Sequence, residues 1–349
     1  MKNIITFLIV VLVGLSSTAQ QKQYKIRTVG FYNLENLFDT VNDTEKNDEA
    51  SPIMEMQGDR EKVYRDKLEK LSDVIIQLGA DKAKTSPALL GVVEVENKKV
   101  LEDLVATEKL KKKRYGIIHF DSPDKRGIDV ALLYQKRYFK PIHFEAFNPN
   151  IYSSENKKIY TRDILWVSGY LDDELVHVIV NHWPSRRGGE AKSSPLREKA
   201  AYQVTQILEK IKLNDPNPKV MIMGDFNDDP INTSIKKVLN TKTKKKNVAE
   251  GDIYNPFEDM FRRGFNTLAY RDNLNLFDQI MFTSPLLDKG QKDFSSFKMF
   301  KAGIFNKRFL TNKKGRYKGY PLRSFAGGKY TGGYSDHFPV YMYLIKEKK

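Results

Sequence analysis

The chain has 349 residues, of which 40% are hydrophobic and 11% aromatic, and this composition excludes a globally disordered protein. It contains no cysteine, which excludes a disulfide framework and lipid attachment through an N-terminal cysteine. A formal net charge of +15 favours polyanionic or phosphorylated partners without specifying one. No linker or strong repeat divides the chain, so we expect one catalytic domain over residues 20–349.

The first residues form a separate signal. Lys2 precedes the apolar run 4–15, and small residues at 17–19 occupy the positions of a cleavage site. This pattern predicts a signal peptide over residues 1–19 and therefore an exported protein, periplasmic or secreted. An uncleaved N-terminal anchor is the alternative. No later stretch is long and apolar enough to span a membrane, and we expect a monomer.

The first predicted strand ends in polar residues. Residues 24–31 alternate between apolar and polar and predict a strand, with Asn33 and Glu35 at its exit. Either side chain can reach a site at that end, although an Asx turn that ends the strand also explains Asn33. The acidic stretch 39–49 is interpreted as a solvated loop.

The second predicted strand carries an unexpected carboxylate. An apolar stripe at helical spacing predicts a helix over residues 63–78, and residues 88–95 then predict a buried strand. Glu94 lies near the end of that strand, where a carboxylate is costly unless it is paired or bound to a metal. Glu94 is therefore a candidate metal ligand, with a paired structural Glu as the alternative and Glu96 as the second choice.

Two arginines precede strands in the middle of the chain. Arg126 comes just before one predicted strand, and Arg162 just before another. Each is a candidate phosphate contact, while an ordinary surface ion pair also explains Arg162. The elements expected here are a helix over 100–110 and strands over 115–120, 128–134 and 164–171.

The next strand, over residues 175–180, leads to His182. A histidine at a strand end, near other candidate residues, can donate a proton near neutral pH. Residues 185–189 are basic and rich in glycine and predict a mobile turn. Ser194 and Pro195 then predict the cap and first turn of a helix that continues to about residue 211.

A short apolar strand over residues 220–223 precedes the sequence Gly-Asp-Phe-Asn. Because side chains repeat every two residues along a strand, Asp225 and Asn227 are expected to face the same side. An ionised Asp can hold a cation or orient a water, and a neutral Asn can donate to an anionic oxygen. The alternative is a turn in which Asp225 caps a helix. The order strand, helix, strand favours an α/β crossover.

The C-terminal part adds one more acidic strand and a basic segment. Asp278 is the single acid in the strand 276–282, and Asp336 and His337 precede a final strand over 340–344. Residues 307–330 contain eight Lys or Arg, five Tyr or Phe and no acid. This composition suits contact with a phosphate backbone and stacked bases, or else a glycine-rich surface loop.

The polar residues share one pattern, since each follows an apolar strand. Together the motifs resemble the endonuclease/exonuclease/phosphatase superfamily, which includes deoxyribonuclease I, over about residues 25–346. The matching pieces, in family order, are FYNLEN, VVEVEN, NHWPS, GDFN, FDQIMF and SDH. The sequences of these motifs are similar to those of an exported bacterial subgroup of the superfamily. The resemblance implies a four-layer α/β sandwich, with two mixed β-sheets packed face to face and helices on the outside.

The resemblance also implies a metal site. Glu94 would be the principal Mg²⁺ ligand, with Mn²⁺ as an alternative ion, and Asn33 and Asp336 would lie in the metal shell. Such a cation would relieve repulsion among the carboxylates. The chain departs from the family at Val93, where a Gln is usual, and the segment 307–330 has no counterpart that we can place.

Catalytic roles follow in the same way. Asp225 would orient or deprotonate the attacking water, and Asn227 would hydrogen-bond a phosphoryl oxygen. Asp278 would fix the tautomer of His337 and favour its imidazolium, which stabilises developing negative charge. His182 would stabilise the transition state or protonate the leaving oxygen.

These observations predict an exported Mg²⁺-dependent phosphodiester hydrolase, an endonuclease acting on DNA or RNA by in-line attack of water on phosphorus. The alternative is a phosphatase, or a phospholipid or inositol-phosphate phosphodiesterase, of the same superfamily. A third interpretation is a binding module that has kept the fold and lost the chemistry.

Overall fold

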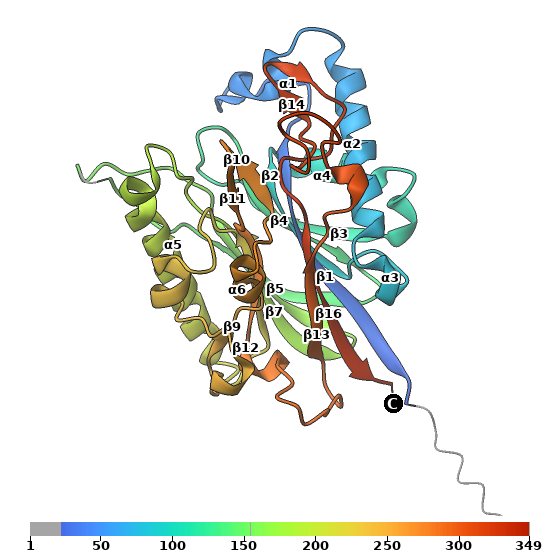
Figure 1. Cartoon of the computed structure of the whole chain (residues 1–349), viewed down its shortest axis with the longest axis vertical. Helices are drawn as coiled ribbons and strands as arrows, with labels where there is room; N and C mark the ends of the chain where they lie inside the picture. The colour runs from blue at the N-terminus through green and yellow to red at the C-terminus, as the bar shows by residue number, and fades with distance from the viewer. Residues whose placement is uncertain (1–21, 154, 349) are drawn as a thin grey trace, which may run out of the picture.

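The computed structural model describes residues 22–153 and 155–348, and the signal peptide expected over residues 1–19 lies outside them. Two six-stranded sheets form the centre of the molecule (Figure 1). The first sheet has the order β13 (Lys298–Ile304), β16 (Val340–Glu347), β1 (Tyr24–Leu37), β2 (Leu89–Val95), β4 (Asp129–Gln135) and β3 (Tyr115–His119). The second has the order β5 (Phe139–Phe147), β6 (Ile164–Leu171), β7 (Glu174–His182), β8 (Val220–Asp225), β12 (Asp278–Thr283) and β9 (Ile253–Tyr254).

Both sheets are mixed, and each contains one central parallel pair. β1 runs parallel to β2, and β7 runs parallel to β8, whereas the other neighbours are antiparallel. Parallel strands are usually buried on both faces, which explains the nearly continuous apolar runs in β2 and β8.

Three apolar clusters separate four layers. The cluster between the sheets takes one face of each strand, for example Phe31 of β1 and Met223 of β8. The opposite faces, with Tyr32 of β1 and Ile222 of β8, pack against helices. Because each strand contributes to two clusters, alternate side chains build both packing interfaces. The predicted four-layer α/β sandwich is thereby confirmed.

The helices lie outside the sheets. Figure 1 shows α5 (Glu190–Lys212) on one side, and α2 (Arg60–Gln77) with α4 (Lys98–Ala106) on the other. Shorter elements are α1 (Pro52–Glu55), α3 (Ala80–Ala83), α6 (Phe257–Arg262) and the hairpins β10 (Leu268–Tyr270) with β11 (Asn273–Asn275) and β14 (Phe325–Ala326) with β15 (Lys329–Tyr330). None of the helices in the described part of the chain has the length and hydropathy needed to cross a bilayer.

Two expectations about local structure were wrong. Helix α5 begins at Glu190 rather than at Ser194, and Pro195 lies inside it. Side chains stabilise its first turn, because the Ser193 hydroxyl donates to the Gly189 carbonyl oxygen over 2.7 Å. The acidic stretch is also not fully solvated, since Asp48 is buried and accepts from the backbone N–H of Asp43.

Candidate active site

The central strands of the two sheets end side by side and bring four of the predicted residues together. Asn33 pairs in register with Val93, the residue before Glu94, and His182 pairs with Asp225. Contacts of 3.8 Å or less then join the two sheets at this edge, from His182 to Glu94 and from Asn33 to Asp225. Groups from widely separated parts of the sequence therefore share one site.

A break in strand pairing directs Glu94 into this site. The β2 register slips between Val93 and Val95, and Glu94 adopts a left-handed backbone conformation with φ of 58°. Non-glycine residues rarely adopt this conformation, and strain of this kind is concentrated at functional sites. The bulge removes Glu94 from the buried alternation of β2, so that its carboxylate accepts from the backbone N–H of Asn36 over 3.0 Å.

Asn33 links the two carboxylates of the site. Its amide nitrogen donates to Glu94 Oε1 and to Asp225 Oδ2, each over 3.1 Å. Its side-chain oxygen accepts from the backbone N–H of Glu35 over 2.9 Å. Asn33 therefore presents N–H groups to the carboxylates, whereas the family resemblance implied a place in the metal shell.

The carboxylates fit a divalent cation. Glu94, His182 and Asp225 each offer an atom within 4.8 Å of the others. The pKa of Asp225 is raised to about 7, chiefly by burial; the charge of His337 opposes this rise, and the charges of Asp278 and Glu94 add to it. A hard cation such as Mg²⁺ prefers oxygen ligands and would offset this repulsion.

Asp336 lies apart from that cluster. Its carboxylate pairs with Arg323 Nη2 over 2.6 Å, and its side chain is about one-third exposed. Among the described residues it belongs to none of the three His and carboxylate groups with metal-binding spacing. The expected place of Asp336 in the metal shell therefore differs from the observed one, because Arg323 occupies its carboxylate.

Gly224 lets Asp225 reach the site. A β-carbon at Gly224 would lie 2.4 Å from the Asn181 carbonyl oxygen, so only glycine permits this approach of β8 to β7. Asp225 Oδ1 then accepts from the backbone N–H of Asn227 over 2.9 Å. β8 ends at Asp225, and Asn227 has a φ of 49°, so the expected strand alternation does not continue to it.

His337 is held between carboxylates. Its Nδ1 lies 2.7 Å from Asp278 Oδ2, and its Nε2 lies 3.9 Å from Asp225 Oδ2. Burial alone would lower the pKa of His337, but Asp278, Asp225 and Asp336 raise it well above its usual value. The imidazolium is therefore the form present at neutral pH, as the pairing with Asp278 led us to expect.

His182 has the opposite protonation state. Burial, followed by the charges of Arg162, Arg126 and His337, lowers the pKa of His182 well below its usual value. The ring is therefore neutral at pH 7 and can donate a hydrogen bond, but it holds no extra proton. This differs from the expectation that His182 acts as a proton donor near neutral pH.

The two predicted arginines differ in access. Arg162 is buried and donates to Asp124 Oδ2 over 3.2 Å and to the carbonyl oxygen of Trp183. Its guanidinium thereby braces the end of β7, unlike the open phosphate contact that we expected. Arg126 is about half exposed, at 3.5 Å from Asp124 Oδ1, and can meet a ligand.

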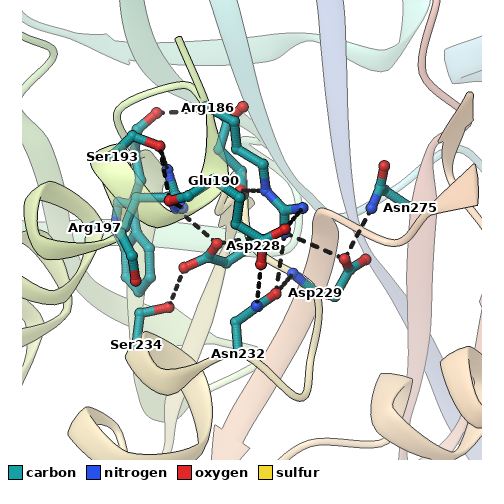
Figure 2. A network of polar contacts seen from close by, with 12 residues as sticks. Arg186, Glu190, Ser193, Arg197, Asp228, Asp229, Asn232, Ser234 and Asn275 are labelled. Atoms are coloured by element: carbon teal, nitrogen blue, oxygen red, sulfur yellow. Dashed lines mark hydrogen bonds and ion pairs between the residues drawn. The ribbon is translucent and has the colours of Figure 1, made fainter. Parts of the chain in front are cut away.

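The loop after Asp225 is fixed by a polar network that the sequence did not reveal (Figure 2). Arg186 donates to the Asn227 carbonyl oxygen over 2.9 Å, and it pairs with Glu190 and Asp229 over 2.7 and 3.2 Å. Buried Arg197 contacts Asp228 over 2.7 Å. The predicted mobile turn is therefore anchored at Arg186. The two arginines and two aspartates were visible in the sequence, but nothing in it paired them.

This chain belongs to the Endonuclease/Exonuclease/phosphatase family, because the sequence model of that family matches residues 28–346. None of the curated proteins compared with it matches significantly. Several solved structures share the fold. A humanized D. rerio TDP2 with 14 mutations is 14% identical, with a TM-score of 0.54 over 92% of this chain and 99% of that one.

Two other solved structures show a similar degree of likeness. The human Nocturnin catalytic domain with bound sulfate is 14% identical, with a TM-score of 0.52 over 94% of this chain and 98% of that one. A mannosyl-6-phosphatase of Bacteroides thetaiotaomicron is 15% identical, with a TM-score of 0.51 over 91% and 99% of the respective chains. At these identities the comparisons establish a common fold alone.

Proposed function

We propose that this chain is a divalent-metal-dependent phosphoester hydrolase that cleaves phosphodiester bonds in nucleic acid. The observation that carries this proposal is the meeting of Asn33, Glu94, His182, Asp225 and His337 through contacts of 3.1 to 3.9 Å. These residues bring groups from both sheets together, and burial and charge drive the pKa values of His182, Asp225 and His337 apart. Such pairs of shifted groups are typical of acid–base sites.

The residues divide the work of hydrolysis. The ionised carboxylate of Asp225 takes the proton of the attacking water, for which a pKa of about 7 is well placed. The His337 imidazolium donates to the phosphoryl oxygens as negative charge develops, and Asp278 orients it. The Nε2 of neutral His182 lies 3.8 Å from Asp225 Oδ2, and its ring can donate a hydrogen bond to the substrate.

Two further residues hold the substrate phosphate. The Asn227 amide donates to the Trp183 carbonyl oxygen over 3.0 Å, and its second N–H is available for a phosphoryl oxygen. A Mg²⁺ or Mn²⁺ ion would be held by Glu94, which leaves Asp225 to act as the base, and it would supply Lewis-acid stabilisation of the phosphoryl group when bound. Arg126 lies at the exposed side of the same cluster.

Charge supports a polyanionic substrate. The chain has a net charge of +15, and residues 307–330 contribute eight cations and no acid. Affinity for nucleic acid that rests on such contacts falls steeply with salt. A small phosphomonoester carries a single phosphate group and would contact only a small part of this basic segment. The charge therefore favours nucleic acid over the phosphatase or lipid phosphodiesterase alternative.

The test is a substrate panel with the purified chain. We expect single-stranded DNA, RNA or plasmid to be cleaved with Mg²⁺ or Mn²⁺ and to survive intact with EDTA. Asp225→Asn is the inactive control. Hydrolysis of sugar phosphates, inositol phosphates or sphingomyelin without any nucleic-acid cleavage would overturn the nuclease proposal and leave the alternative in place.

We also propose export, on the sequence of residues 1–20 alone. Cell fractionation followed by N-terminal sequencing tests this, with a mature chain beginning at Gln20 outside the cytoplasm as the expected result. An intact N-terminus in the cytoplasmic fraction contradicts it.

A further inference from the structure

A cavity of about 560 Å³ adjoins the candidate active site. One wall is the β10–β11 hairpin, and the other is the basic segment 307–330, which Figure 1 shows at the same end of the molecule. Asp336, the residue before His337, is one of the residues that line the cavity. The volume is within the roughly 300–1,000 Å³ of small-ligand pockets. A group bound here would therefore sit next to a phosphate held at His337.

The two walls are joined by Asp272 of the hairpin turn. Its carboxylate pairs with Arg316 Nη2 over 2.6 Å and accepts from the Tyr320 hydroxyl over 2.9 Å. The basic segment is also tied to the core, because buried Lys67 of α2 donates to the Ser324 hydroxyl over 3.3 Å. The cavity is thus pre-formed, which reduces the entropy cost of binding.

The lining combines aromatic faces with positive charge. Tyr270 and Tyr317 are 61% and 56% exposed, so their rings are accessible to a ligand. The Tyr317 ring lies 5.7 Å from that of Tyr320, and the Arg271 guanidinium lies 5.3 Å from that of Tyr270. Planar rings beside cations are suited to a base and the phosphate attached to it, because every base has a π-face that stacks on an aromatic side chain.

We propose that this cavity binds the nucleotide unit adjacent to the scissile phosphate, with its base stacked on Tyr317 and its phosphate near Arg271. The inference rests on the proposed nuclease function and gives it a preference for single-stranded substrate, because a paired base cannot enter a side pocket. The eight cations and absent acids of residues 307–330 favour a continuing phosphate backbone over a sugar carrying one phosphate.

The first test measures binding without cleavage. A fluorescently labelled single-stranded oligonucleotide is titrated with the protein in EDTA, beside an abasic backbone with the same number of phosphates. Stacking on one aromatic side chain contributes about 10-fold to affinity. We therefore expect Tyr317→Ala to weaken oligonucleotide binding by about that factor and to leave abasic binding unchanged. Tyr317→Phe, which keeps the ring, restores the affinity.

The matched control is Tyr202→Ala. Tyr202 is 60% exposed, as Tyr317 nearly is, but it lies on α5 away from the cavity. We expect it to bind like the unmodified chain. Equal affinities for Tyr317→Ala and Tyr202→Ala would overturn the inference, as would displacement of the oligonucleotide by mannose 6-phosphate as effective as that by a nucleoside monophosphate.

The second test measures cleavage of the same oligonucleotide with Mg²⁺ and separates the two claims. Cleavage that is insensitive to Tyr317→Ala overturns the cavity assignment and leaves the proposed function standing. Binding that depends on Tyr317 without any cleavage supports the cavity and overturns the nuclease function. Cleavage that falls about 10-fold in kcat/KM with Tyr317→Ala supports both.

Discussion

The candidate active site and the neighbouring cavity are built in opposite ways. The catalytic groups stand at the ends of core strands, and Asp225, His182 and His337 are each no more than 8% exposed. The cavity is lined by a hairpin turn and a long loop, and Tyr270 of the turn and Tyr317 of the loop are more than half exposed. The first region fixes how a phosphate is attacked, because its geometry is set by two packed sheets. The second can vary without disturbing the core, so it selects what is attached to that phosphate.

The largest effect is expected when the general base Asp225 is removed, because this change affects the catalytic region and leaves the cavity intact. Asp225→Asn keeps the shape of the side chain but removes the proton acceptor, and general-base catalysis is typically worth about 10²- to 10⁴-fold. We therefore expect kcat to fall by about that factor on every substrate, large or small. Steady-state kinetics on an oligonucleotide and on the small phosphodiester bis(p-nitrophenyl) phosphate measure this loss.

The control for this variant is Asp173→Asn, at an exposed turn. It should retain full activity. Removing the buried charge of Asp225 relieves its desolvation, so the melting temperature of Asp225→Asn should not fall. Activity lost on one substrate class and retained on the other would contradict a shared catalytic region.

The second prediction concerns the support of that region. Arg186→Ala removes the bonds to the Asn227 carbonyl oxygen and to Asp229, so the loop that carries Asn227 loses its anchor. Small displacements of a positioning group can cost about 10²-fold. We expect a 10- to 100-fold lower kcat with little change in KM.

The neighbouring arginine provides a matched control. Arg187 is exposed and carries the same charge, and it is not among the residues labelled in the network of Figure 2. Arg187→Ala should leave kcat unchanged, and Arg186→Lys should recover part of it, since an ammonium keeps the charge without the planar fork. An equal loss of kcat in Arg186→Ala and Arg187→Ala would mean that the positive charge, rather than the positioning of Asn227, supports catalysis.

The sequence located the active-site end of the fold because its core strands end abruptly in polar residues. The apolar runs before Glu94, His182 and Asp225 identified strands, and packing both sheets together left their ends at one edge. Family order then supplied Asp278 and His337, whose 2.7 Å contact depends on residues 59 positions apart. The fold class was confirmed on the same grounds.

What the sequence did not reveal depends on register and on long-range pairing. The bulge that turns Glu94 into the site lies inside an otherwise regular apolar run. Strand β5 was missed because it is an edge strand with one buried residue among exposed and half-buried ones, and it carries Pro141 at a register shift. Asp336 was misplaced because its partner Arg323 comes from a loop that no local pattern positions.

The third prediction concerns the cavity and the positive charge of its wall. Lys313 and Lys314 are exposed cations of the segment that forms its outer wall. The double substitution Lys313→Gln and Lys314→Gln should raise KM for single-stranded nucleic acid about 3- to 10-fold at low salt. It should also reduce the slope of log affinity against log salt by about 1.4, at 0.7 per phosphate contact. Hydrolysis of bis(p-nitrophenyl) phosphate should be unaffected.

Its control makes the same change of charge elsewhere. Lys245→Gln with Lys246→Gln alters a short 3-10 helix over residues 245–247, away from the hairpin and the basic segment. If both double variants lower affinity equally, total charge rather than the cavity wall attracts the substrate.

The smallest expected effect is on the pH dependence of stability, and it distinguishes the roles of the two histidines of β7. His177 and His182 both lie in β7, but His177 bonds to Ser168 over 2.7 Å and faces Asp215 over 3.3 Å. Burial lowers the pKa of His177, with Asp215 opposing. The unfolded chain therefore binds the proton more readily, and stability falls as the pH decreases below about 6.5. His177→Gln should flatten this part of the stability curve and leave kcat at neutral pH unchanged.

Urea unfolding between pH 5 and 8 measures that slope, with the unmodified chain as the reference. An unchanged slope in His177→Gln would mean that other groups cause the loss of stability in acid. A changed kcat would place His177 within the catalytic region. The expected result, altered stability with intact turnover, assigns one buried histidine of β7 to packing and reserves the other for chemistry, because only His182 reaches the strand end where the carboxylates meet.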